Sequence, residues 1–118
     1  MFSSRLQQVA KRIEGTVALS LVAKDGIAVD TLRLEPGVDL ELLTAELMSQ
    51  VRAVSNHHQD LAVGKIRAFS VTTDRYVLMI SALTDDYYLL LVLHAGGNAG
   101  RARFELRRAV LLFEDDLR

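Results

Sequence analysis

The most conspicuous residues with a capacity for chemistry form a glycine-rich stretch, Gly96-Gly97-Asn98-Ala99-Gly100, ahead of a predicted helix. Backbone N–H groups in such a stretch can cradle a phosphate. A P-loop, however, continues with Gly-Lys-Ser/Thr, which contact the β- and γ-phosphates and the magnesium ion. Here Arg101-Ala102-Arg103 follows, and the glycine spacing also misses GxGxxG. We therefore interpret the stretch as a tight strand-to-helix turn with Asn98 as the helix cap.

Histidine side chains are the other candidates for ligand binding. His57-His58 could bind a metal ion together with Asp60, and His94 stands at the end of a predicted strand. Adjacent helical residues point about 100° apart, so the two neighbouring histidines do not converge easily on one ion. No further ligand is placed beside them or beside His94. We interpret the pair as positive charge at a helix C-terminus, and we expect no metal or other cofactor.

A catalytic set of side chains cannot be placed either. Asp85-Asp86 could form a carboxylate pair, but acid–base chemistry needs two carboxyls whose environments separate their pKa values, and neighbours in a turn are usually both solvated. No Ser–His–Asp set can be placed from these residues and we see no nucleophile elbow, and the lack of cysteine excludes thiol nucleophiles, disulfides and Cys-ligated metal centres. The sequence therefore predicts a protein that is not an enzyme.

The charges of the last predicted helix run against its dipole. Four arginines crowd its N-terminal half and three carboxylates its end: Arg101, Arg103, Arg107, Arg108, Glu114, Asp115 and Asp116. Each nearest charge costs about 0.3–1 kcal/mol in this arrangement. One interpretation is a solvated face with intrahelical pairing, in which Arg103 and Arg107 flank Glu105. The other is a surface that meets acidic residues of a partner.

Composition and charge narrow the class of protein. The chain has 118 residues, 50% of them hydrophobic and 25% charged, so it can form one domain, residues 1–118, around a buried core. A net charge of −1 argues against a nucleic-acid binder. Apolar runs are too short to span a bilayer and we find no signal peptide, which predicts a cytoplasmic protein. The mean hydropathy of +0.19 is high for so small a domain and indicates a buried oligomer interface.

Hydrophobic periodicity predicts eight elements in the order α-β-β-α-β-β-β-α. The helices are expected over Ser4–Glu14, over Leu40–Ser55, and from after Asn98 to about Asp116. The strands are expected over Thr16–Lys24, Ile27–Leu32, Lys65–Thr73, Arg75–Leu83 and Tyr87–His94. Because the connections are short, neighbouring strands are expected to run antiparallel.

Local signals support these boundaries. Ser4 and Gln7 match a capping box, and Asp39 is a plausible N-cap for the second helix. Asp25-Gly26 predicts a two-residue hairpin with a type I′ turn. The last two strands are apolar almost without interruption, so we expect central strands with helices on both faces of the sheet. The fold class is therefore α+β.

The second helix is apolar over more of its circumference than one core-facing side needs. Its main stripe comprises Leu40, Leu43, Leu47, Val51 and Val54. Leu42 and Ala45 widen the apolar surface, and Met48 flanks the stripe. Such a helix is either simply buried or packs on the sheet with one side and on another helix with the next. We favour the second interpretation, an interface, in so small a domain.

The whole pattern resembles the roadblock (dynein light chain) family, and within it the bacterial MglB-like branch. The resemblance covers nearly all of the chain. It rests on the order of elements, on Asp25-Gly26 at the first hairpin, and on Gly97-Asn98-Ala99-Gly100 leading into Leu106-Arg107-Arg108-Ala109. It implies a profilin-like fold, a five-stranded antiparallel sheet between helices.

The resemblance also implies a mode of association. Family members form homodimers or heterodimers in which the third strands, here Lys65–Thr73, pair edge to edge and the second helices pack side by side. In MglB-like members the paired second helices contact a Ras-like small GTPase. Some of these proteins stimulate GTP hydrolysis without donating an arginine finger, and other family members are scaffolds.

We therefore expect a homodimeric, non-enzymatic regulator or scaffold of a Ras-like small GTPase, GTPase activation included. The residues expected at the dimer interface and the adjoining partner groove are Leu43, Leu47, Met48, Val51 and Val54, with Phe69 and Val71 on the pairing strand. Two alternatives remain open. One is a nucleotide-blind assembly scaffold, and the other is a small-ligand sensor of profilin-like or PAS-like shape with a closed apolar cavity.

Overall fold

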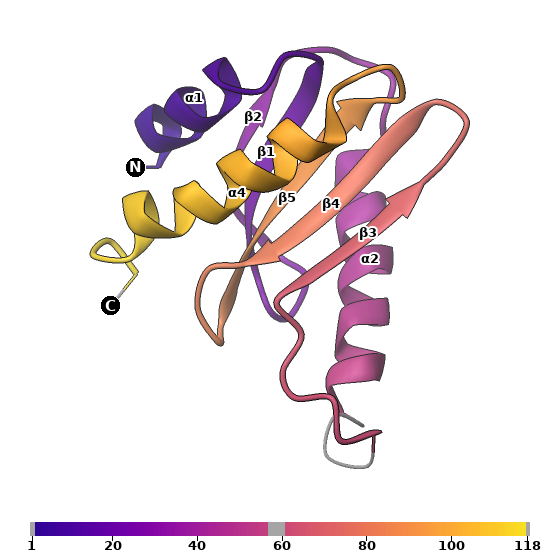
Figure 1. Ribbon diagram of the computed structural model, residues 1–118, viewed down its shortest axis with the longest axis vertical. Helices are drawn as coiled ribbons and strands as arrows, with labels where there is room; N and C mark the ends of the chain where they lie inside the picture. Colours follow the sequence, from indigo (N-terminus) through magenta and orange to yellow (C-terminus); the bar gives the residue numbers. More distant parts are fainter. Residues whose placement is uncertain (1, 57–60, 118) are drawn as a thin grey trace.

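The computed structural model describes residues 2–56 and 61–117 and has the expected order of elements. Its helices are α1 (Ser3–Lys11), α2 (Leu40–Ser55) and α4 (Ala99–Phe113). Its strands are β1 (Thr16–Ala23), β2 (Ala28–Arg33), β3 (Ala68–Thr72), β4 (Tyr76–Ala82) and β5 (Tyr87–His94). The strands form one antiparallel sheet in the order β2-β1-β5-β4-β3 (Figure 1). The predicted fold class is confirmed.

The sheet separates two hydrophobic clusters. Figure 1 shows α1 and α4 on one face and α2 on the other. Side chains of β5 alternate between the clusters: Leu89, Leu91 and Leu93 face α1 and α4, whereas Leu90 and Val92 face α2. The continuous apolar runs of β4 and β5 are buried on both faces, as predicted for central strands.

The start of α1 differs from the prediction. The helix begins at Ser3, its N-cap is Phe2, and no side-chain hydrogen bond of the cap residue closes it, so the capping box at Ser4 is wrong. The hydrogen bonds at the start of the helix come from Asp30 of β2 instead. Its carboxylate accepts hydrogen bonds from the Phe2 N–H (3.1 Å) and the Ser3 hydroxyl (3.4 Å). A carboxylate at a helix N-terminus also complements the helix dipole.

The first hairpin lies where it was predicted but has a different turn. Gly26 has a φ of +93°, whereas Asp25 has no positive φ, which excludes a type I′ turn. The Gly26 N–H donates to the Ala23 carbonyl, and the Asp25 carboxylate accepts from the Ile27 N–H. The pairing of β1 with β2 also shifts register beside Leu21 and Val22. The loop is therefore longer than two residues.

The remaining boundaries lie within a few residues of the prediction, although α1 ends at Lys11 and not at Glu14, and α4 ends at Phe113 and not near Asp116. The bounds of α2 are those predicted, and the Asp39 side chain accepts from the Leu42 N–H (3.2 Å) as its N-cap. The main shortening is in β3, which begins at Ala68 and not at Lys65. Within the described residues, no helix has the length and hydropathy that a bilayer crossing would require.

Candidate interaction surface

The glycine-rich stretch forms a tight turn from β5 into α4. The Asn98 side chain accepts a hydrogen bond from the Arg101 N–H (2.9 Å), which confirms it as the helix cap. A Cβ at Gly97 would lie 2.8 Å from Leu93 Cγ and 3.0 Å from the His94 carbonyl oxygen. Packing within the turn therefore accounts for the glycine, without any phosphate.

His94 has a partner that the sequence did not indicate. Its Nε2 lies 2.9 Å from both carboxylate oxygens of Glu35, and its ring stacks on Tyr76 with the ring centroids 6.0 Å apart. These side chains bring together the loop after β2 and the facing ends of β4 and β5. The suggested ligands His57, His58 and Asp60 lie outside the described residues, so that interpretation stays untested.

The two neighbouring aspartates do not act as a pair. Asp85 forms an ion pair with Lys65 (3.2 Å), and Asp86 forms one with Lys24 (3.1 Å). Both carboxylates are exposed, in agreement with the solvated interpretation. Their separate partners leave no shared site for acid–base chemistry.

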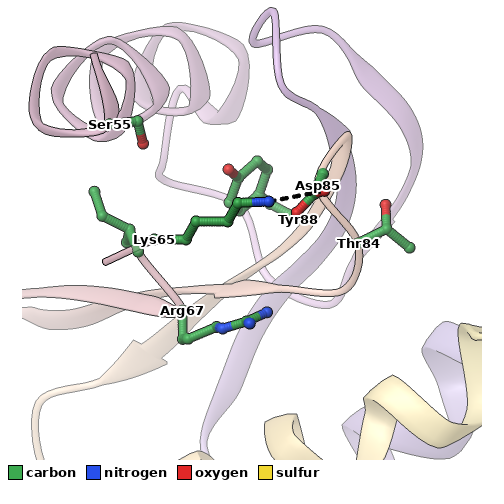
Figure 2. Close-up of a pocket in the computed structure, with 7 residues that line it drawn as sticks. Ser55, Lys65, Arg67, Thr84, Asp85 and Tyr88 are labelled. Atoms are coloured by element: carbon green, nitrogen blue, oxygen red, sulfur yellow. Dashed lines mark hydrogen bonds and ion pairs between the residues drawn. The ribbon is translucent and has the colours of Figure 1, made fainter. Parts of the chain in front are cut away.

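The Lys65–Asp85 pair crosses an open pocket of about 230 Å³ (Figure 2). The pocket lies between Ser55 at the end of α2, the segment before β3, and the turn from β4 to β5. Figure 2 shows the Lys65 side chain extending across it in front of Tyr88. An opening that charged side chains occupy does not resemble the closed apolar cavity expected of a small-ligand sensor.

The α4 arginines pair in a different way from the one predicted. Glu105 is buried, with 2% of its surface exposed, and it contacts Arg101 (3.2 Å) and Arg108 (3.3 Å). Arg103 and Arg107, which were expected to flank it, project from another side of the helix. Ion pairs within the helix therefore compensate the charges of Arg101 and Arg108, but not those of Arg103 and Arg107.

Three of the residues expected at an interface are already covered by the chain's own sheet. Leu47, Met48 and Val51 are 8%, 1% and 1% exposed and belong to the cluster beneath α2. Their side chains face the sheet because they recur at helical spacing with Leu40 and Thr44. A direct contact between these three side chains and a second copy stays a prediction, and the structure gives them a core role within one chain.

The other four interface candidates keep exposed surface and share one side of the molecule. Gly26 of the β1–β2 hairpin lies beside Ala45, Met48 and Arg52 of α2. At about 100° per residue, Leu43 and Val54 project roughly opposite Arg52, away from that hairpin and toward the β3 end of the sheet. Leu43 and two β3 side chains, Phe69 and Val71, are half-buried against the same cluster. We call Leu43, Val54, Phe69 and Val71 the β3-side strip.

The outer edge of β3 is open within the described residues. The Arg67 carbonyl accepts from the Ala82 N–H, and the Thr73 N–H donates to the Tyr76 carbonyl, so odd-numbered residues hydrogen-bond to β4. Because these bonds alternate along an antiparallel pair, the backbone groups of Ala68, Ser70 and Thr72 point outward. This edge has neither a charged side chain nor a register shift.

The opposite edge of the sheet is protected. β2 contains Asp30 and Arg33, has an irregular register with β1, and is contacted by the start of α1. Charges, bulges and covering elements are the usual means by which proteins prevent edge-to-edge pairing. β3 uses none of these, so it is the edge suited to pair with another strand.

No family model matches the chain, and no curated protein matches it.

Solved structures do resemble the chain over nearly its whole length. MglC from Myxococcus xanthus is 30% identical, with 98% of each chain covered and a TM-score of 0.72. A Roadblock/LC7 domain from Streptomyces avermitilis is 16% identical, with 97% of this chain and 95% of that domain covered and a TM-score of 0.84. Myxococcus xanthus MglB is 14% identical, with 97% of this chain and 98% of MglB covered and a TM-score of 0.80. At 16% and 14% identity, the last two similarities concern the fold alone, whereas the 30% identity to MglC is a similarity of sequence as well as of fold.

Proposed function

The chain belongs to the roadblock (dynein light chain) family, and from this we propose that it is a non-enzymatic, homodimeric regulator or scaffold of a Ras-like small GTPase. The observation that carries the proposal is the unprotected outer edge of β3. Edge-to-edge pairing of two β3 strands satisfies the outward backbone groups of Ala68, Ser70 and Thr72 in both copies and removes an aggregation hazard.

The β3-side strip supports the same dimer. In a symmetric dimer, the same surface of both copies forms the interface. The apolar side chains beside the pairing strand are therefore buried in each of the two copies. Leu43 and Val54 on α2 then approach the α2 of the second copy, above Phe69 and Val71 of the joined sheet. Burial of this strip accounts for the high mean hydropathy of the chain.

The outward face of α2 is the proposed contact for the GTPase. Leu42 is 59% exposed there, and Ala45 and Ser49 beside it are small and exposed. Two such helices side by side make a continuous surface across the dimer. The proposed effect on the GTPase acts through contact and not through a donated catalytic group.

A capture experiment with a matched pair of variants tests this proposal. The immobilised chain is incubated with lysate of its source cells, one half loaded with a non-hydrolysable GTP analogue and the other with GDP. We expect a small GTPase retained mainly in the GTP half, which then enters a single-turnover hydrolysis assay. Ser70→Pro removes an outward N–H that β4 does not use, so the sheet is expected to survive while edge pairing is blocked.

The mass in solution separates the possible outcomes. Wild type and Ser70→Ala are expected to sediment at twice the 13.1 kDa chain mass, and Ser70→Pro at the chain mass with an unchanged circular dichroism spectrum. The GTPase is expected to bind the first two proteins and not the third. A folded Ser70→Pro variant that still dimerises places the interface elsewhere, and a partner retained equally in both halves of the lysate identifies a nucleotide-blind scaffold.

A further inference from the structure

A groove separate from the proposed GTPase surface lies on the opposite face of the sheet. It has a volume of about 330 Å³ and runs between α4 and β3. Ala68, Ser70, Met79 and Ser81 line it from adjacent positions of β3 and β4, and Leu106 lines it from α4. Met79 and Leu106 belong to the cluster on the α1 and α4 side, whereas α2 covers the other face.

Three arginines border this groove, and none of them forms an ion pair with a carboxylate of the described residues. Arg103 and Arg107 stand on its α4 side, and Arg67 stands just before β3. Arg67 borders both this groove and the pocket that Lys65 crosses, and in Figure 2 its side chain extends away from the Lys65 side chain. Across the described residues, ion pairs involve Arg5, Lys24, Arg33, Lys65, His94, Arg101 and Arg108, and none involves these three arginines.

The spacing of the arginines indicates the shape of an occupant. Arg103 and Arg107 are four positions apart on α4, so they are separated by about 6 Å along the helix axis. Two carboxylates four positions apart on a second helix have the same spacing. An apolar side chain between them would meet the apolar part of the groove at Met79 and Leu106.

The neighbouring face of α4 adds apolar contact area. Phe104 is 50% exposed, and its ring lies between Arg101 and Arg108, whose guanidinium carbons are 6.0 Å and 5.8 Å from the ring centroid. These cation–π contacts hold the ring in place, and Leu111 follows it along the same face. An exposed aromatic ring bordered by arginines is typical of a protein-binding surface.

We propose that this groove binds an acidic amphipathic helix of another protein, with carboxylates on Arg103 and Arg107 and an apolar residue between them. A flat anionic membrane fits less well, since it cannot enter a concave groove and reach the apolar side chains at its floor. The proposal does not depend on dimerisation or on a GTPase, because the groove is formed within one chain.

A labelled synthetic peptide tests the proposal. The probe is a covalently stapled helix in which Glu residues at i and i+4 flank a leucine stripe, and the control is a scrambled peptide of the same composition and charge. Titration by fluorescence anisotropy is expected to give saturable binding of the probe only, weakened by salt. Amide NMR shifts are expected to map to residues 67–70 and 103–107.

Charge-reversal variants locate the binding site. Arg103→Glu/Arg107→Glu is expected to weaken binding by about ten-fold or more, because two charge pairs become repulsive. The matched control Lys11→Glu/Arg12→Glu changes two exposed positions near the end of α1 by the same total charge and is expected to bind as wild type does.

Three results would overturn the proposal. The first is no saturable binding of the probe, and the second is equal binding of the probe and the scrambled peptide. The third is binding of wild type to vesicles of phosphatidylcholine and phosphatidylglycerol, lost in Arg103→Glu/Arg107→Glu, without peptide binding. That last result would assign the surface to a membrane.

Discussion

Gly97 illustrates how a residue that suggests chemistry can be explained by packing. A Cβ at this position would lie 2.8 Å from Leu93 Cγ, closer than side-chain carbons normally approach, and 3.0 Å from the His94 carbonyl oxygen, which is also a tight contact. The neighbouring Gly96 has nothing within 4 Å of the equivalent position. There is therefore room for a side chain at Gly96 but not at Gly97, although the two glycines are neighbours in the sequence.

This difference predicts opposite outcomes for two alanine substitutions. Gly97→Ala is expected to lower the free energy of unfolding by about 1–3 kcal/mol, because the β5–α4 turn must shift to admit a methyl group. Gly96→Ala is the matched control and is expected to change it by less than about 0.5 kcal/mol. Urea denaturation followed by circular dichroism measures both, and equal stabilities would contradict the packing explanation.

Asp30 shows that the start of one element can depend on a residue of another. Partial burial raises the pKa of its carboxyl, but hydrogen bonds from the Thr31 and Phe2 backbone N–H groups and the Ser3 hydroxyl, together with nearby positive charge, outweigh this and lower the pKa. The ionised carboxylate thus stabilises the contact between β2 and the start of α1.

A pH titration of stability is expected to reveal this contact. Since the pKa is lower in the folded state, the contribution of Asp30 is complete above its unfolded value of about 3.9 and is lost as pH falls through the folded value. At pH 7, Asp30→Asn is expected to lower the free energy of unfolding by about 0.3–1 kcal/mol. The difference in free energy of unfolding between wild type and Asp30→Asn is expected to disappear in acid. A difference that does not change with pH would show that the effect has a cause other than the charge of Asp30.

The molecule as a whole presents different surfaces at the β3 end and on its two faces. The sheet order places β3 at an open edge, α2 carries half-exposed apolar side chains toward that edge, and α4 borders a basic groove on the other face. The proposed dimer uses the edge of β3, whereas the proposed GTPase contact and the proposed helix-binding groove lie on the two opposite faces of the sheet.

Two substitutions on α2 distinguish its core side from its interface side. Leu47→Glu is expected to unfold the chain, because Leu47 is buried and an unpaired charge there costs several kcal/mol, on the order of 3–5. Val54→Glu is expected to fold and to sediment as a monomer, since Val54 is 38% exposed on the side toward β3.

Ser49→Glu provides the control, because it adds the same charge to an exposed position on another side of α2. It is expected to stay folded and dimeric. Sedimentation velocity and thermal denaturation report both properties. A dimeric Val54→Glu variant would exclude Val54 from the interface and leave Leu43 and β3 as the proposed contacts.

Features that depend on neighbours in the chain were predictable. The order of the elements, the bounds of α2 with its Asp39 cap, and the Asn98 turn follow from periodicity and capping, which act over a few residues. The central position of β4 and β5 followed from their continuous apolar runs. The resemblance to the family also came from this local pattern and order.

Features that join distant segments needed the folded chain. The partnership of His94 with Glu35 spans 59 positions, and that of Asp30 with Phe2 spans 28, so no local pattern reports either of them. Periodicity identified the apolar stripe of α2 but not which members the sheet would cover, since that depends on how the helix is rotated against β1, β4 and β5. The edge position of β3 was expected only from the family resemblance, and the unpaired arginines beside it were not expected at all, because strand order and charge pairing are decided by contacts between elements far apart in the sequence.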